Sequence, residues 1–459
     1  MSTLSNILEQ GRRALQVQQI AMQVIGHNTS NAGSAGYSRR RLDLGTAPPG
    51  QTGQWGVGSG VDINQLGRVR DSLLDTQIRS NTSVASYWSS REDQLGRVEE
   101  TFNALGSNNL GKLMDDFWQG WHDLANDPES NTPRFALRDR AQALISSLKR
   151  VHDNLNGQLE EANARIADSA QQINYLTSAI AELNVRIIQG ELGGHEASDL
   201  RDSRDLLVEQ LANITDLTVQ EQANGTIHVY SAGQIIVQGD LAVSVRIDRV
   251  ATDPKNNVVL TLGSSPLPWT PQGGELGALF EQRNKVLPQL MSKLDQFARE
   301  FTQSINAVHA QGWGLDGTQG HDFFASDVTG VHDLRLSTSV LEDVDHIAAS
   351  SSENAPGDNS LALAIAGIQG QTSSTGETLD QMLRNTPLEV GSTRAAAIQQ
   401  RDVESAVLDN AISRRMSISG VSLDEEMARL IETQKAYEAA AKIVQTVDQM
   451  MDTILNLKQ

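Results

Sequence analysis

The chain has 459 residues, of which 39% are hydrophobic and only 4% aromatic, and its formal net charge is −20 at pH 7. Because an acidic surface repels phosphate backbones and anionic lipid, the composition argues against nucleic-acid binding and membrane association. The absence of cysteine excludes disulfides, thiolate zinc sites, iron–sulfur clusters and a cysteine nucleophile. No apolar run approaches the ~18 residues of a membrane span, and no basic segment followed by an apolar stretch opens the chain. We therefore expect no membrane insertion and no cleaved signal peptide.

The first clear pattern lies in residues 4–28, which we predict to form an amphipathic helix. Its apolar side chains recur at three- and four-residue steps, which gathers them on one helix face. Residues 28–37 (NTSNAGSAGY) are rich in turn formers and end the helix, and the prolines and glycines of residues 48–60 indicate a loop. The apolar stripe includes Leu4, Leu8, Leu15, Met22 and Ile25.

The middle of the chain alternates between helical and strand-like patterns. Residues 217–263 are β-like, with glycines at the expected turns. Residues 310–360 are rich in loop-forming residues. Helices are predicted at residues 66–124 with a break near 106–111, and at 134–189, 198–214, 275–309, 361–368 and 392–413.

The last segment has the strongest helical periodicity. A heptad-type stripe runs along it at alternating steps of four and three residues, interrupted only by two polar members. Acidic residues follow its first member, as is favourable at a helix N-terminus. The stripe contains Leu423, Met427, Leu430, Gln434, Tyr437, Ala441, Val444, Asp448, Met451 and Leu455.

Together these patterns predict an elongated, multidomain, mainly α fold of α+β type, with a small inserted β domain. We expect a long helical coiled-coil bundle built from both the N- and C-terminal parts of the chain. Residues 1–65 would pair with 415–459, residues 66–215 would form a helical rod with 275–414, and residues 216–274 would be a small outer β domain. An isolated amphipathic helix is marginal in water, so each terminal stripe needs a partner.

Motifs that could carry chemistry favour structural interpretations. Residues 106–112 (GSNNLGK) resemble a phosphate-binding loop, but leucine follows where Ser or Thr would hold magnesium. His309, His321 and Asp322 come nearest to a metal cluster, yet the spacing of a known zinc motif is missing, and His309 is interpreted as a packing residue. The aspartates and arginines of residues 199–205 are interpreted as an intrahelical ion-pair lattice. We therefore predict no catalytic, cofactor-binding or metal site and no enzymatic activity; an enzyme with a coiled-coil stalk is the alternative.

Both ends of the chain resemble the flagellar rod, hook and hook-associated proteins. Residues 26–41 (GHNTSNAGSAGYSRRR) are similar to their N-terminal motif at Asn28, Asn31, Gly36 and Tyr37, among others. Residues 419–457 resemble their C-terminal segment more closely. Interior blocks at residues 199–205 and 274–324 resemble the hook-associated protein 1 group, whereas a rod or hook subunit would lack them.

This resemblance implies a structural component of the bacterial flagellum at the hook–filament junction. It implies a homo-oligomeric ring that contacts hook protein and hook-associated protein 3. It also implies secretion by the flagellar type III export apparatus without a cleaved signal peptide, an export chaperone on the C-terminal helix, and no nucleic-acid partner. The residues expected to assemble are the N-terminal stripe, the four motif residues just named, and Leu423, Met427, Leu430, Gln434, Tyr437, Val444, Met451 and Leu455.

Overall fold

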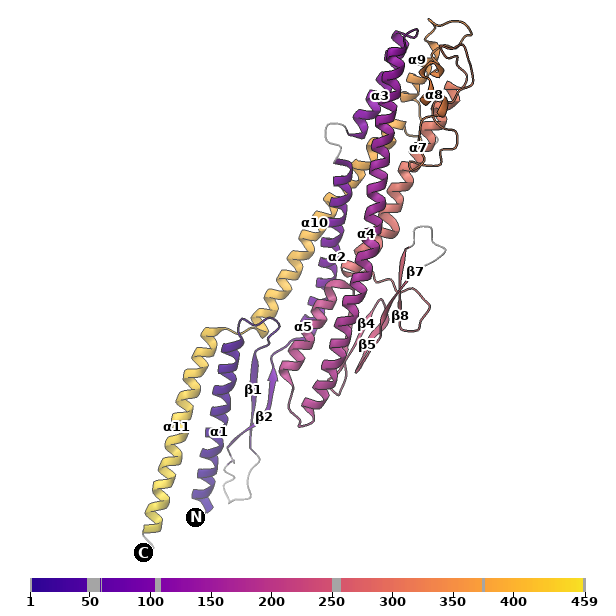
Figure 1. Cartoon of the computed structure of the whole chain (residues 1–459). Helices are drawn as coiled ribbons and strands as arrows, with labels where there is room; N and C mark the ends of the chain where they lie inside the picture. The colour runs from indigo at the N-terminus through magenta and orange to yellow at the C-terminus, as the bar shows by residue number, and fades with distance from the viewer. Residues whose placement is uncertain are drawn as a thin grey trace.

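The computed structural model describes residues 2–47, 58, 60–103, 109–249, 257–373 and 376–456. The molecule is elongated, and the two chain ends lie together at one end of it (Figure 1). There the first helix, α1 (Ser2–Asn31), packs alongside the last helix, α11 (Leu423–Asn456). The predicted mainly α fold with inserted β structure is confirmed. Most of the loop predicted at residues 48–60 lies outside the described residues.

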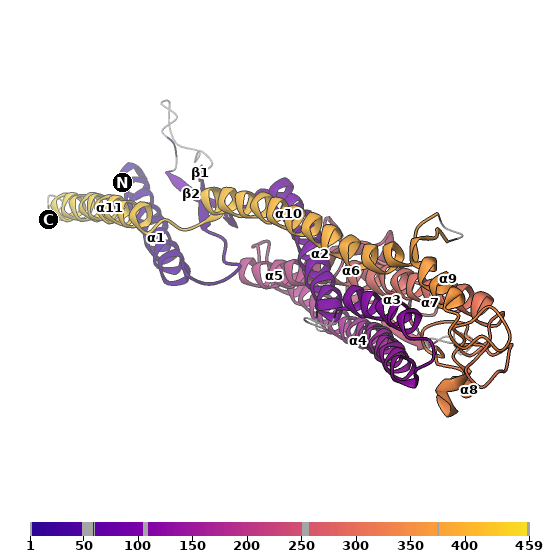
Figure 2. The ribbon, with the colours of Figure 1, turned by 90° about the horizontal axis from the view of Figure 1, so that it is seen from above.

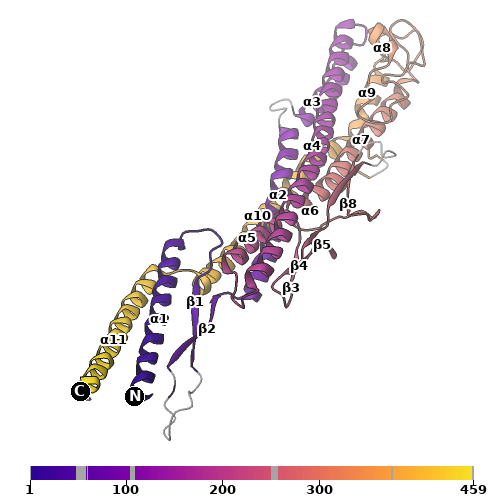
Figure 3. The same cartoon turned by 60° about the horizontal axis from the view of Figure 1, so that its bottom comes forward.

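A β-hairpin follows the first helix and runs back beside it (Figure 3). Strands β1 (Arg40–Thr46) and β2 (Val61–Arg68) are antiparallel, with one register shift between Asp43 and Leu44. The hairpin and α1 therefore form one unit with α11. Residues 69–71 and 420–422 connect this unit to the helices of the body.

The body of the molecule is a bundle of long helices. The longest, α4, spans 61 residues, and α10 runs along α2 before the chain turns into α11 (Figure 2). Helix α10 begins 13 residues before the predicted start, because Thr378 and Gln381 form a capping box ahead of Pro387. The helices are α2 (Ser72–Asn103), α3 (Leu110–Asn126), α4 (Asn131–Glu191), α5 (Ser198–Ile214), α6 (Gly274–Glu281), the π-helical turn Gln282–Val286, α7 (Leu287–His309) and α10 (Leu379–Ser419).

The β structure within residues 216–274 packs on α4 and shares its hydrophobic core with α4, α5 and α6. Trp269 and Ile173 are both fully buried in this shared core. One sheet has four antiparallel strands in the order β3-β4-β5-β6, and β7 pairs with β8 separately. The strands are β3 (Thr218–Glu221), β4 (Ile227–Ser231), β5 (Gln234–Gln238), β6 (Leu241–Ala242), β7 (Val245–Arg249) and β8 (Val258–Leu262).

The end of the molecule farthest from the termini is a loop-rich tip that covers residues 310–373 (Figure 1). Its irregular backbone is held by a buried aromatic cluster in which Phe323 and Phe324 meet Phe117 of α3 and Phe301 of α7. The short helices here are α8 (Thr338–Glu342), the 3-10 turn Val344–His346, α9 (Ser360–Ala366) and the 3-10 turn Gly367–Gly370. None of the described helices is both long and apolar enough to cross a membrane.

Candidate functional site: the terminal helix pair and its joint

The contact between α1 and α11 runs along one face of each helix. On α11, Glu426, Ala440 and Val447 are buried, whereas Val17 and Ile25 are buried on α1. Close approach is possible because α1 has a glycine at the crossing. A Cβ on Gly11 would lie 2.6 Å from the Val444 side chain. The terminal helices thus bury a continuous but narrow seam.

The seam on α11 is displaced from the predicted one. Of the eight α11 residues expected to assemble, four lie at its edge and are partly buried, namely Leu430, Tyr437, Val444 and Met451. The other four are solvent-exposed: Leu423 (52%), Met427 (51%), Leu455 (57%) and Gln434. The difference arises because a second 4-3 series, which begins at Glu426, shares those four edge positions, and this series faces α1. On α1, Leu4, Leu8, Leu15 and Met22 are partly buried, and Ile25 is buried.

Asn28 ties three segments together at the inner end of the helix pair. Its Nδ2 donates to the Arg40 carbonyl oxygen (3.0 Å) and to Glu426 Oε2 (3.1 Å). Its Oδ1 accepts from the Tyr37 hydroxyl (2.8 Å) and from the Arg40 amide (2.9 Å). The buried Asn28 side-chain amide therefore has hydrogen-bond partners for both its nitrogen and its oxygen. It links α1 and α11 to the loop of residues 32–39 that follows α1, called the motif loop below.

The other motif residues support this arrangement. Burial raises the pKa of Tyr37 to about 12, so the phenol stays a hydrogen-bond donor. Gly36 has φ +78°, a conformation that favours glycine, and it lies against Leu206 of α5. Asn31 bonds locally, to the His27 carbonyl oxygen (2.9 Å).

A buried ionic cluster joins the hairpin end to α5. Arg68 Nη1 donates to Asp202 Oδ1 and Asp205 Oδ2, each at 2.9 Å, and Arg68 Nε donates to Glu196 at 2.7 Å. Arg70 adds a bond to Asp205 at 2.8 Å. Burial alone would lower the pKa of Arg68, but the neighbouring aspartates outweigh it and raise that pKa. The cluster therefore remains ionised.

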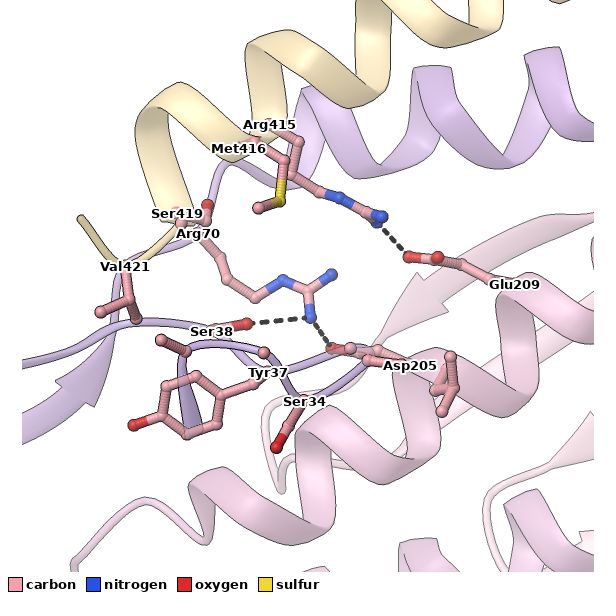
Figure 4. A pocket seen from close by; sticks show the side chains of 16 residues that line it. Ser34, Tyr37, Ser38, Arg70, Asp205, Glu209, Arg415, Met416, Ser419 and Val421 are labelled. Carbon is pink, nitrogen blue, oxygen red and sulfur yellow. Dashed lines mark hydrogen bonds and ion pairs between the residues drawn. The ribbon is translucent and has the colours of Figure 1, made fainter. Parts of the chain in front are cut away.

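A crevice of about 360 Å³ lies at this joint (Figure 4). The motif loop forms one wall, and the end of α10 forms another, where Arg415 pairs with Glu209 of α5. In the same crevice Arg70 donates to Asp205. Because these charged groups are paired with one another, the crevice suits a stiff joint between the helix pair and the body more than acid–base catalysis.

One charge interpretation from the sequence requires correction. The predicted intrahelical lattice on α5 is wrong, because Asp202 and Asp205 bond to Arg68 and Arg70 from outside the helix. Their helix neighbours also turn elsewhere: Arg201 pairs with Glu191 and Glu221, and Arg204 donates to the Gly225 carbonyl oxygen. The three arginines at residues 39–41 have different surroundings: Arg39 pairs with Glu425, Arg40 pairs with Asp199, and Arg41 is exposed.

The other motifs that could carry chemistry lie in structural settings. The described part of the phosphate-loop-like motif opens α3, where Lys112 pairs with Asp116. His309 is buried with both ring nitrogens bonded to backbone. The sequence did not identify Arg68, Arg70 and Glu426 as site residues. The spacing of Arg68 and Arg70 in an extended segment could have indicated that both side chains lie on the same face.

Known proteins similar to this chain share both its ends and its interior. The model of the flagellar hook-associated protein FlgK helical domain matches residues 95–324, and the flagellar basal body rod FlgEFG protein C-terminal model matches residues 412–457. Flagellar hook-associated protein 1 of Bacillus subtilis (strain 168) is 26% identical, covering 98% of this chain and 97% of that protein. Its Escherichia coli (strain K12) counterpart is 24% identical, covering 99% and 100%.

The fold is also shared with a solved structure. The flagellar hook junction protein FlgK from Burkholderia pseudomallei superposes with a TM-score of 0.66 at 15% identity, covering 75% of this chain and all of that one. The resemblance inferred from the terminal motifs and interior blocks is confirmed. The chain therefore belongs to the family of the flagellar hook-associated protein FlgK, and it is a structural protein of the bacterial flagellum and not an enzyme.

Proposed function

We propose that this chain forms a ring of identical subunits at the hook–filament junction, in which α1 and α11 of each subunit pack against those of its neighbours. One observation carries the proposal: α11 exposes large apolar side chains on both sides of its seam with α1. Such side chains in water favour association, so a second partner surface is required.

The exposed side chains form two separate groups. Leu423, Met427 and Ile431 repeat every four residues along one flank near the start of α11, and each is more than half exposed. The second group, Ile443 and Met450, lies on the opposite flank nearer the end of the helix, where the exposed Ile454 continues the series that faces α1. Full burial of each such side chain contributes about 1.5–3 kcal/mol. Two flanks suit two neighbours, as a ring requires.

The further partners follow from the same surface and from the family. An export chaperone would cover the apolar flanks of α11 before assembly. Hook protein would lie on one side of the ring and hook-associated protein 3 on the other. Export would use the flagellar type III apparatus, with no cleaved signal peptide, and would deliver the chain to the extracellular flagellum.

The test is gene deletion followed by complementation. Deletion should leave hooks without filaments, seen by electron microscopy, and release flagellin into the medium. Wild-type chain should restore filaments, whereas Met427→Asp or Ile443→Asp should not. The matched control is Thr446→Asp, which adds the same charge on the polar face of α11 beside Lys442.

Three outcomes would oppose the proposal in different ways. Loss of the hook on deletion would indicate a rod or hook subunit. Normal filaments on deletion would remove the junction role. Full complementation by both aspartate variants would show that the exposed flanks are not the assembly surface.

A further inference from the structure

Three potential metal ligands converge in the loop-rich tip, at the opposite end from the terminal helices. The ligand atoms of Asp316, His321 and His346 all lie within 4.8 Å of one another, and they are the one such group among the described residues. We infer that these three side chains bind a divalent transition metal of the zinc type. This inference is independent of the proposed function.

His346 is already oriented as a metal ligand. Its Nδ1 lies 3.0 Å from the Ser339 carbonyl oxygen, and a carbonyl oxygen can only accept, so Nδ1 carries the proton. In the neutral ring, Nε2 then presents its lone pair to Asp316 Oδ2 at 3.3 Å. Two acceptors face each other across this gap, so a cation or a proton must lie between them. A carbonyl behind the distal nitrogen is the usual support of a zinc-bound histidine.

The separation between these two atoms also fits a metal. Zinc bonds to nitrogen and oxygen are about 2.0–2.2 Å long, which places neighbouring ligand atoms of a tetrahedral site about 3.3–3.5 Å apart. The Asp316 and His346 side chains are each about one-quarter exposed, so an ion can enter and water can complete the coordination.

His321 completes the set through a hydroxyl bridge. The Thr318 hydroxyl donates to Asp316 Oδ2 at 2.6 Å and lies 2.8 Å from His321 Nε2, from which it accepts. The His321 and His346 rings have centroids 4.3 Å apart. Direct bonding of the metal to His321 would replace the hydroxyl bridge: Nε2 would lose its proton to solvent and Nδ1 would take one up, so that the ring binds as a neutral imidazole.

The backbone fixes the ligands even though the tip has little regular structure. The Leu315 amide donates to the Asp345 carbonyl oxygen at 2.7 Å, which sets Asp316 beside His346. The buried His309 donates from Nδ1 to the His321 carbonyl oxygen (2.6 Å), and its Nε2 accepts from the Ala348 amide (2.9 Å). His309 therefore clamps together the two segments that carry the ligands.

The donor set selects the class of metal. Two imidazoles and one carboxylate suit zinc and its transition-metal neighbours, whereas calcium and magnesium prefer all-oxygen sites. In a chain without cysteine, such a site would fasten the loops of the tip where disulfides cannot.

The test is calorimetric titration of the chelator-treated, untagged full-length chain with zinc chloride at pH 7.5. We expect one zinc per chain, a higher thermal unfolding temperature, and no comparable binding of calcium or magnesium. His346→Ala should weaken zinc binding at least 100-fold, and Asp316→Asn should weaken it less. Titration of the unmodified chain with cobalt(II) should show the visible absorption of a four-coordinate nitrogen–oxygen site.

The matched control is His332→Ala, which removes the other described histidine pair, where the His152 and His332 rings lie 6.4 Å apart. This variant should bind zinc as the unmodified chain does. The inference would be overturned if His346→Ala bound zinc as tightly as the unmodified chain, or if only His332→Ala lost zinc binding. It would also be overturned if the unmodified chain bound no zinc and gave a six-coordinate cobalt spectrum.

Discussion

The buried ionic cluster at the joint predicts a large, local effect of Arg68→Met. The substitution keeps an unbranched apolar stem but removes three charged hydrogen bonds, to Glu196, Asp202 and Asp205. Removal of one partner from a buried ion pair costs about 3–5 kcal/mol, because the remaining charge is uncompensated. Arg70 still faces Asp205 at 2.8 Å, so we expect the lower end, about 3 kcal/mol.

Hydrogen exchange is the assay that locates this cost. Because the cluster fastens the hairpin to α5, its loss should increase opening of β1 and β2 about 100-fold, by the usual conversion of free energy to an equilibrium constant. The amides of α3, which packs on α4, α9 and α10 nearer the tip, should exchange as before. Asp202→Asn in the Arg68→Met background should restore part of the protection, because it removes a buried charge that has lost its nearer partner and keeps only Arg70, at 3.6 Å.

The control is Arg246→Met, which removes an exposed arginine whose pair with Asp248 spans 3.4 Å. Surface pairs contribute about 0–1 kcal/mol, so this variant should match the unmodified chain. Equal exchange in β1 and β2 for both variants would refute the argument that the buried cluster holds the joint.

Two further predictions concern single positions. Gly274→Ala should abolish the soluble fold, because φ is +66° and a Cβ would lie 2.3 Å from the Ile214 backbone. In the control Gly233→Ala, φ is +74° but the space around the residue is open, so the free energy of unfolding measured in urea should fall by only about 1 kcal/mol. Equal losses of stability in the two variants would contradict this prediction. Because the folded pKa of Tyr37 is about 12 and the unfolded value is about 10, its stabilisation is complete below pH 10 and is lost as pH rises toward 12. Burial also raises the pKa of Tyr87, so absorbance titration should show late-ionising tyrosine absorbance that Tyr37→Phe reduces but does not abolish. An unchanged titration would contradict the assignment.

The long helices were predictable because their apolar residues repeat with the helical period over many turns. Helix α4 was expected at residues 134–189 and spans Asn131–Glu191. The start of α10 was missed because Pro387 and Gly391 are poor helix formers, and the capping box at Thr378 and Gln381 outweighs them. Local propensity therefore predicted the presence of the helices better than their ends.

Clusters built from distant segments were less predictable. Asp202 and Asp205 have arginines beside them in sequence, so an intrahelical lattice was the simpler interpretation, yet the fold supplies Arg68 and Arg70 instead. In the tip, the sequence pattern placed His321 with His309 and Asp322 as the nearest approach to a metal cluster. His346 lies 25 residues farther along and reaches it only through the folding of irregular loops.

The displaced seam on α11 shows why periodicity alone is ambiguous in an assembling helix. A helix that meets a partner within its own chain and other partners in neighbouring subunits carries apolar residues on more than one face, and each face repeats every seven residues. The predicted series from Leu423 and the observed series from Glu426 share four residues, so both fit the sequence; the four are Leu430, Tyr437, Val444 and Met451. The structure of the single chain distinguishes the two series, because the buried residues of α11, which are Glu426, Ala440 and Val447, all belong to the series that faces α1. The exposed members, Leu423 and Met427 among them, are then the part of the pattern through which the proposed ring would contact other subunits.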